Sequence, residues 1–164
     1  LKLMDQNPEA AIDHYSQAVV LDPADDVAFR KRGHCYLKMQ QYLYAIADLT
    51  RSDELLSGLP ETYVLRGNAY LKSGQLKEAN ADFEKAIKEL MATNPQAIKS
   101  HLGRPASTEQ RDVVDNSYTY LYMMTFANAE DEAAYQVDPT HLKFVESANH
   151  LWKKVVVYDS SAID

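Results

Sequence analysis

The chain has 164 residues, of which 46% are hydrophobic and 25% are charged, and its formal net charge at pH 7 is −7. This size and composition are those of a globular protein with a core of its own, and they exclude a disordered or fibrous chain. The acidic balance, without a dense basic block, argues against nucleic acid as the main partner. No apolar run approaches the roughly 18 residues of a membrane span, so we expect no membrane insertion.

The single cysteine, Cys35, has no second cysteine for an internal disulfide or a zinc site. Its neighbour His34 does not make it a nucleophile, because adjacent side chains on a helix point in different directions. We interpret Cys35 as a small buried side chain of an intracellular, cytoplasmic protein, or a cytoskeletal or ciliary one if the chain is an assembly subunit. The sequence begins inside a helical unit, so we expect a part of a longer chain or complex.

A 34-residue period runs through the first half of the chain. Gly33 aligns with Gly67, and each glycine lies on a stripe of apolar and aromatic residues with helical spacing. A second stripe follows each of them, so every repeat predicts two short helices in an antiparallel hairpin that stacks on its neighbours. The other signature positions are Ala11, Tyr15, Ala18, Pro23, Tyr36, Ala45, Tyr70, Ala79, Phe83 and Ala86.

This pattern resembles the tetratricopeptide repeat (TPR) over residues 1–93. The resemblance rests on the Gly-x-x-Tyr of both glycines, on AIDHYSQA and ANADFEKA, and on the closing LDP. It implies an all-α fold, an α-solenoid that winds as a right-handed superhelix, with a partial repeat at 1–25 and repeats at 26–59 and 60–93. It also implies that Gly67 lies where two helices approach closely, so that packing offsets its low helix propensity of about 1 kcal/mol.

The repeats do not continue into the second half, because His101 stands where the next glycine is expected. We predict a loop or linker at 94–107 and a C-terminal helical extension at 108–164. Within the extension, apolar spacing predicts helices at about 108–129 and 139–158. The final hairpin would otherwise expose its stacking face, so we expect these helices to cap the last repeat.

Three features could indicate catalysis or metal binding, and we interpret each as structural. His141, Glu146 and His150 have no further ligand at a fitting spacing, and we assign them to a solvated helix face. The tyrosine run at 118–122 has the spacing of a half-buried helix. The sequence contains no glycine-rich phosphate loop and no serine elbow. We therefore predict no enzyme activity, no metal and no cofactor.

The resemblance implies that the first helix of each repeat lines a concave groove, which in relatives receives peptides or helices. The positions that match the groove are Val27, Arg30, His34, Lys38, Glu61, Val64, Asn68 and Lys72. Four of these carry a basic or imidazole group and one carries an acid, which favours a protein partner with an acidic peptide or helix. The alternative interpretation is that they are solvated charges of a short groove.

The sequence leaves open three functions. The first is an adaptor or scaffold that binds a partner protein in the groove, and the second is a permanent subunit of a large assembly, such as a ciliary or transport complex. The third is a co-chaperone, which the sequence disfavours. Some relatives hold acidic chaperone tails through a carboxylate clamp of Lys, Asn and Arg, but here the matching positions hold Lys31, Glu61 and Leu65.

Overall fold

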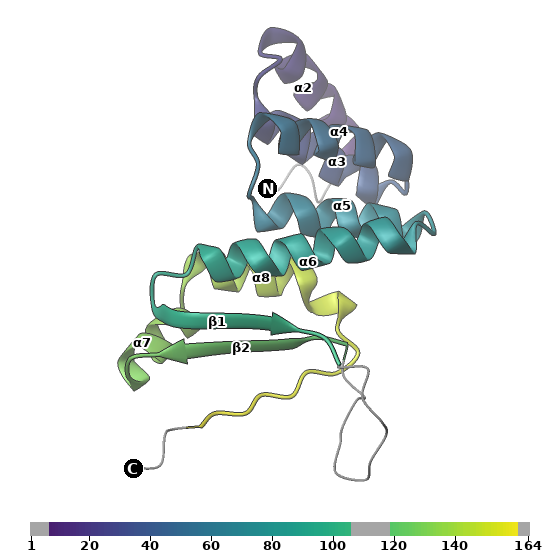
Figure 1. Cartoon of the computed structure of the whole chain (residues 1–164). Helices are drawn as coiled ribbons and strands as arrows, with labels where there is room; N and C mark the ends of the chain where they lie inside the picture. Colours follow the sequence, from purple (N-terminus) through teal and green to yellow (C-terminus); the bar gives the residue numbers. More distant parts are fainter. Residues whose placement is uncertain (1–6, 106–118, 161–164) are drawn as a thin grey trace.

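The computed structural model describes residues 7–105 and 119–160. Its first half is a stack of antiparallel helices (Figure 1). The helices are α2 (Pro8–Leu21), α3 (Asp26–Lys38), α4 (Tyr42–Leu55), α5 (Pro60–Lys72) and α6 (Leu76–Ala92). The α3–α4 and α5–α6 hairpins are the two complete predicted repeats, and α2 is the second helix of the partial repeat. The prediction of TPR-like helical hairpins is therefore confirmed.

Helices α2 and α3 begin at side chains that cap them. The side chain of Asn7 accepts a hydrogen bond from the amide of Ala10 at 3.0 Å, and Asp25 accepts one from Ala28 at 2.9 Å. Both contacts satisfy amides that have no partner inside the helix. A proline opens both α2 and α5, because its fixed φ suits the first turn and its missing N–H costs nothing there.

The two signature glycines lie at close approaches between the helices of each hairpin. A Cβ atom at Gly67 would stand 2.6 Å from a ring carbon of Phe83, and one at Gly33 would stand 2.8 Å from Cγ of Leu49. Ala45 and Ala79 on the facing helices are almost fully buried. The small residues therefore set the spacing inside the hairpins, as the sequence predicts.

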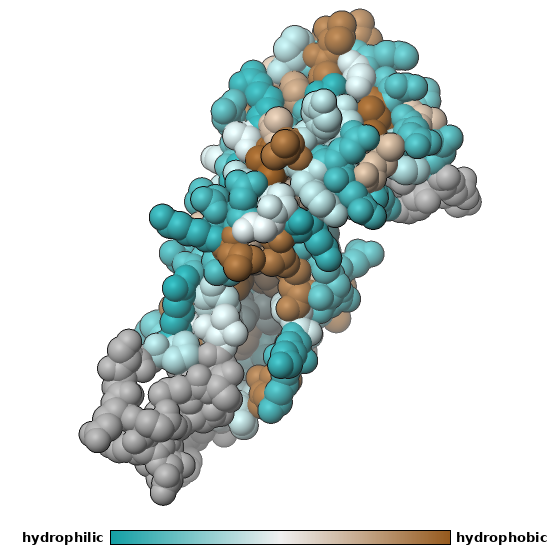
Figure 2. Space-filling model, turned by 90° about the vertical axis from the view of Figure 1, so that its right-hand side faces the viewer, coloured by the Kyte–Doolittle hydropathy of each residue, from teal (hydrophilic) through white to brown (hydrophobic). Residues whose placement is uncertain are grey.

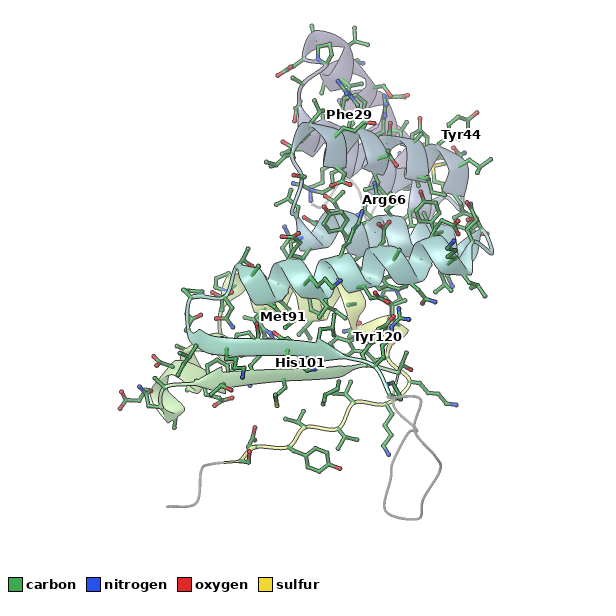
Figure 3. The ribbon with its side chains drawn as sticks, viewed as in Figure 1. Phe29, Tyr44, Arg66, Met91, His101 and Tyr120 are labelled. Atoms are coloured by element: carbon green, nitrogen blue, oxygen red, sulfur yellow. The ribbon has the colours of Figure 1, made fainter. Side chains whose placement is uncertain are left out.

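The second half is not all helical. It contains strands β1 (Ala97–Gly103) and β2 (Leu121–Phe126), helices α7 (Ala129–Gln136) and α8 (Pro139–Ala148), and a short 3-10 helix, η1 (Asn149–Leu151). The strands pair antiparallel in a two-stranded sheet. Figure 1 shows α6 and α8 on one side of the strands, and Figure 3 places Met91 between α6 and β1. Helix α6 thus belongs to the last hairpin and also covers the sheet.

These elements correct three predictions. The helix expected at 108–129 is wrong over residues 121–126, which form β2. Residues 108–118 of that prediction lie outside the described residues. The loop expected at 94–107 contains β1. The last helix ends at Ala148, with residues 153–160 extended. Residues 121–126 and 153–160 are rich in aromatic and β-branched residues, which favour extended backbone over a helix. The spacing of a short apolar run does not distinguish a strand from a helix.

Helix α5 is the most enclosed element of the structure. Eight consecutive residues, 62–69, are buried, because α4 and α6 pack on two of its sides and α8 packs on a third. One core cluster joins Tyr63 and Val64 of α5 to Ala86 of α6 and Ala148 of α8. Helix α8 therefore caps the last hairpin. No helix in the described parts of the chain is long and apolar enough to cross a membrane.

Candidate functional site: the concave surface of α3 and α5

The predicted groove residues come from the first helix of each complete repeat, and they fall into an α3 half and an α5 half of one surface, which the TPR resemblance predicts to be concave and which we call the concave surface. Each set of four has spacings of three or four residues, which place its members on one helix face. The α3 half holds Val27, Arg30, His34 and Lys38, and the α5 half holds Glu61, Val64, Asn68 and Lys72.

The α3 half is only partly enclosed. Val27 is 45% exposed, Lys38 is exposed and His34 is half-buried. Arg30 differs from the prediction of a groove-lining solvated charge, because it is 8% exposed. Its guanidinium lies 3.1 Å from the carboxylate of Asp26 and 3.3 Å from that of Glu61. Arg30 therefore ties α3 to α5.

The α5 half is covered by the C-terminal segment. Val64 is 1% exposed and Asn68 is 6% exposed. Half-buried Phe144 of α8 and Leu151 of η1 pack on the cluster that contains Val64. The imidazole Nε2 of His150 lies 3.1 Å from Oδ1 of Asn68. A helix from the same chain thus lies on the surface where the sequence predicts a partner.

Glu61 is the electrostatic centre of this contact. Its carboxylate lies 2.7 Å from Nζ of Lys143 on α8, 3.7 Å from Nζ of Lys31, and close to Arg30. Burial alone would raise the pKa of Glu61, but the hydrogen bond from Lys143 and the three positive charges outweigh it and hold the pKa below its ordinary value. Glu61 is therefore an anionic anchor for a cation on a docked helix.

The negative charge of Glu61 lies at a position where a carboxylate clamp would need a positive charge. Glu61 and Leu65 stand where the TPR resemblance places the cations of a carboxylate clamp, and Leu65 is buried in the core. An acid that already binds Lys143 favours a cationic ligand at this point of the surface. The α5 half thus has the opposite charge preference to a carboxylate clamp.

A second group of polar aromatic side chains lies between the sheet and α7–α8, and the sequence does not predict it. The hydroxyls of Tyr122 and Tyr135 are 3.3 Å apart, and the ring of His141 lies 4.2 Å from that of Tyr135. Burial raises the pKa of both tyrosines and lowers that of His141. The sequence LYMMTF of β2 has no alternation of polar and apolar residues, so it gives no signal that Tyr122 lies on the half-buried face of the strand.

The prediction of a solvated face holds for Glu146 and His150, which are exposed, and is wrong for His141. His141 is half-buried, and its Nδ1 atom has no hydrogen-bond partner among the described residues. His150 contacts the concave surface. Within residues 7–105 and 119–160, no three His, Cys, Asp or Glu side chains are grouped in a way that could hold a metal ion.

Comparisons with known proteins match the helical stack to TPR proteins. Human serine/threonine-protein phosphatase 5 is 34% identical over 80 residues, which are 49% of this chain and 16% of that protein. DnaJ homolog subfamily C member 3 of Rattus norvegicus is 34% identical over 86 residues, which are 52% of this chain and 17% of that protein. The chain thus spans less than a fifth of either relative.

Solved structures agree. The second TPR of Spaghetti (RPAP3), bound to the HSP90 peptide SRMEEVD, has a TM-score of 0.50 and 31% identity, and the match covers 51% of this chain and 78% of that one. The crystal structure of MamA has a TM-score of 0.52 and 28% identity, and covers 55% of this chain and 53% of that one.

A family model matches the other half. The model of the stress responsive A/B barrel domain (Dabb) covers residues 69–162, from the end of α5 through the sheet and α8. The match crosses the boundary that the sequence analysis predicts at residue 93, because α6 serves both the last hairpin and the sheet. The chain therefore belongs to the stress responsive A/B barrel domain family, and it carries a TPR segment that shares α6 with that domain.

Proposed function

We propose that this chain is a non-enzymatic protein-interaction module that binds a helix or peptide of a partner protein on the α3 half of its concave surface, beside α8. The observation that carries the proposal is the docking of α8 on the α5 half. There the surface accepts a helix through one apolar cluster, the Lys143–Glu61 ion pair and the His150–Asn68 contact. The neighbouring α3 half is formed by the first helix of the preceding repeat and is more exposed.

The side chains of the α3 half suggest the chemistry of the ligand. Val27 offers an exposed apolar contact at one end, and Lys38 and the exposed Lys72 lie toward the C-terminal ends of α3 and α5. An acidic segment with an apolar anchor would complement this arrangement. Exposed ion pairs contribute only about 0–1 kcal/mol each, so the affinity should be modest and should weaken with salt.

A co-chaperone function is less well supported. The RPAP3 structure holds the peptide SRMEEVD, and a carboxylate-rich peptide of that kind would meet Glu61 at a clamp position here. We expect SRMEEVD to bind this chain about 5- to 150-fold more weakly than it binds RPAP3, because the loss of one charged contact costs about 1–3 kcal/mol. Equal affinity, measured by calorimetry on both proteins, would revive the co-chaperone interpretation.

The second candidate is a permanent structural subunit. Such a subunit would leave a large apolar surface bare when it is isolated. In Figure 2 the apolar residues on the face shown form separate groups among hydrophilic residues. An isolated chain that is monodisperse in solution would favour reversible binding over permanent incorporation.

A peptide library displayed on phage tests the proposal, because it samples many candidate ligand sequences at once. Peptides selected on the parent protein should lose at least about tenfold in affinity against Val27→Asp/Lys72→Glu, since an apolar contact and a charge are lost. The matched control is Leu43→Asp/Lys77→Glu, which makes the same changes at exposed positions of α4 and α6. If the selected peptides bind the first variant with the same affinity as they bind the parent, the α3 half is not the binding surface.

A further inference from the structure

The contact between α8 and α5 is built differently from the contacts inside the repeats. Within a hairpin, Arg66 and Asp82 form an ion pair whose side chains are only 7% and 5% exposed. At the α8 contact, Nζ of Lys143 lies 2.7 Å from the carboxylate of Glu61, but the lysine side chain is 57% exposed. Water reaches this ion pair, and exposed ion pairs contribute little to stability, so the pair holds α8 only weakly.

The other contacts of α8 and η1 form a small interface with an apolar centre and a polar rim. Phe144 and Leu151 are half-buried against the cluster around Val64. The exposed His150 lies beside this centre, with Nε2 3.1 Å from Oδ1 of Asn68. An apolar centre inside a polar rim is typical of interfaces that form and separate, whereas permanent interfaces are more apolar.

The face of α5 under α8 also keeps two polar side chains, Glu61 and Asn68. Burying a charge or an amide costs free energy unless the group gains a polar partner. Here α8 and η1 supply such partners through Lys143 and His150. A surface that is always covered would be expected to carry apolar residues at these positions, whereas a surface that meets water when α8 leaves requires polar ones. The α5 half therefore has the composition of a binding surface.

We propose that the α5 half is a second binding site, for a basic amphipathic helix of a partner protein, and that α8 occupies this site as an internal ligand. The partner helix would place a lysine or arginine on Glu61, as Lys143 does, and large apolar side chains where Phe144 and Leu151 lie. Such a helix docks through one apolar face, with its charges at the edge of that face.

Charge selects this class of partner. The carboxylate of Glu61 faces the docked helix and favours a cation at that point of the surface. The α3 half carries the exposed Lys38 instead and favours an acidic segment. The two halves thus recognise ligands of opposite charge, and the second site does not depend on the ligand of the α3 half.

Competition with α8 determines the affinity that a partner helix shows. The apparent dissociation constant is the intrinsic value divided by the fraction of molecules in which α8 is released. An internal ligand acts at an effective concentration in the millimolar range, so a free helix with the sequence of α8 should bind the parent only at about millimolar concentration. A substitution that weakens the α8 contact without changing α5 should therefore strengthen binding.

A fluorescein-labelled peptide of residues 138–151 tests the proposal on the full chain by fluorescence anisotropy. Phe144→Ala in the chain should bind this peptide at least about tenfold more tightly than the parent does, because α8 is released more often. Lys143→Glu should change the affinity in the same direction and leaves the apolar cluster intact, so it repeats the test if Phe144→Ala loses helical circular dichroism. Leu142→Ala, at an exposed position of α8, should bind like the parent.

The peptide contains no tryptophan, so Trp152 of the chain reports whether α8 is displaced. In a parallel titration with unlabelled peptide, the emission of Trp152 should change as the peptide binds. Equal affinity for the parent and both weakened variants, or no binding up to millimolar concentration, would overturn the proposal. Binding without a change in Trp152 emission would overturn it as well, because the peptide would then lie elsewhere.

Exchanging the charges tests the recognition by Glu61 separately. The Phe144→Ala chain should prefer the peptide with Lys143 over the same peptide with Lys143→Glu by about fivefold, and adding Glu61→Lys to the chain should reverse the preference. An unchanged preference would contradict the site. Val27→Asp alters only the α3 half and should leave binding of this peptide unchanged. The failure of this proposal is therefore distinguishable from the failure of the proposed function.

Discussion

The guanidinium of Arg66 on α5 forms a two-point ion pair with the carboxylate of Asp82 on α6, with nitrogen–oxygen distances of 2.7 and 2.9 Å. The preceding hairpin repeats the pair with Arg32 and Asp48, at 2.7 and 2.8 Å. Figure 3 shows Arg66 among the stacked helices. The same bond therefore joins the two helices of each complete repeat, one period apart.

Arg66→Ala should lower the free energy of unfolding by about 3–5 kcal/mol, because it leaves the buried carboxylate of Asp82 without its partner. Burial opposes the charge of Arg66, but the hydrogen bonds and charges of Asp82 and Asp53 outweigh it and raise its pKa. The control Arg51→Ala removes the exposed pair with Glu54 and should cost about 0–1 kcal/mol. Urea denaturation of both variants measures the difference, and equal costs would contradict a structural role for the buried pair.

Gly67→Leu should destabilise the chain by about 1–3 kcal/mol, because the added side chain meets the ring of Phe83. Ala81→Leu, at an exposed position of the facing helix, should stay within about 0.5 kcal/mol. Thermal unfolding compares the two. If Gly67→Leu had the same melting temperature as the parent, the close approach of α5 and α6 at Gly67 would be disproved.

The contact between α8 and α5 can be weakened without touching the repeats. Phe144→Ala should cost about 2 kcal/mol locally, since its half-buried ring packs on the cluster around Val64. Hydrogen exchange should accelerate in α8 and remain unchanged in α3 and α4. Leu142→Ala, at an exposed position of α8, should leave the exchange rates close to those of the parent. Uniform acceleration throughout the chain would indicate that α8 does not open as a local unit.

Lowering the pH should weaken the contact between α8 and α5, because Glu61 loses its negative charge when it is protonated. Its pKa is depressed in the folded chain, so its contribution is complete above its ordinary value of 4.5 and is lost as the pH falls through the depressed value. The fluorescence of Trp152, the single tryptophan, can follow the detachment because its ring lies 6.5 Å from that of Phe144. Glu61→Gln should flatten this part of the pH profile, and an unchanged profile would assign the transition to another group.

The repeats could be predicted from the sequence because the same contacts within a hairpin recur one period apart. Gly67 and Ala79 mark contacts inside a hairpin, and the period shows them directly. The pairing of β2 with β1 could not be predicted, since it joins segments that are distant in the chain, and the apolar spacing of residues 121–126 also fits a helix. The position of α8 on the concave surface depends in the same way on a contact between distant residues, Lys143 and Glu61.

The most direct test of the account is a map of the surface that binds a library-selected peptide, obtained from the amide NMR spectrum of the full chain. We predict that titration shifts the amides of Val27, His34 and Lys38 on α3, together with those at the edge of α8, and leaves Leu43 and Tyr44 on α4 unchanged. Shifts that centre on α4, with α3 unaffected, would contradict the claim that the concave surface is the binding site.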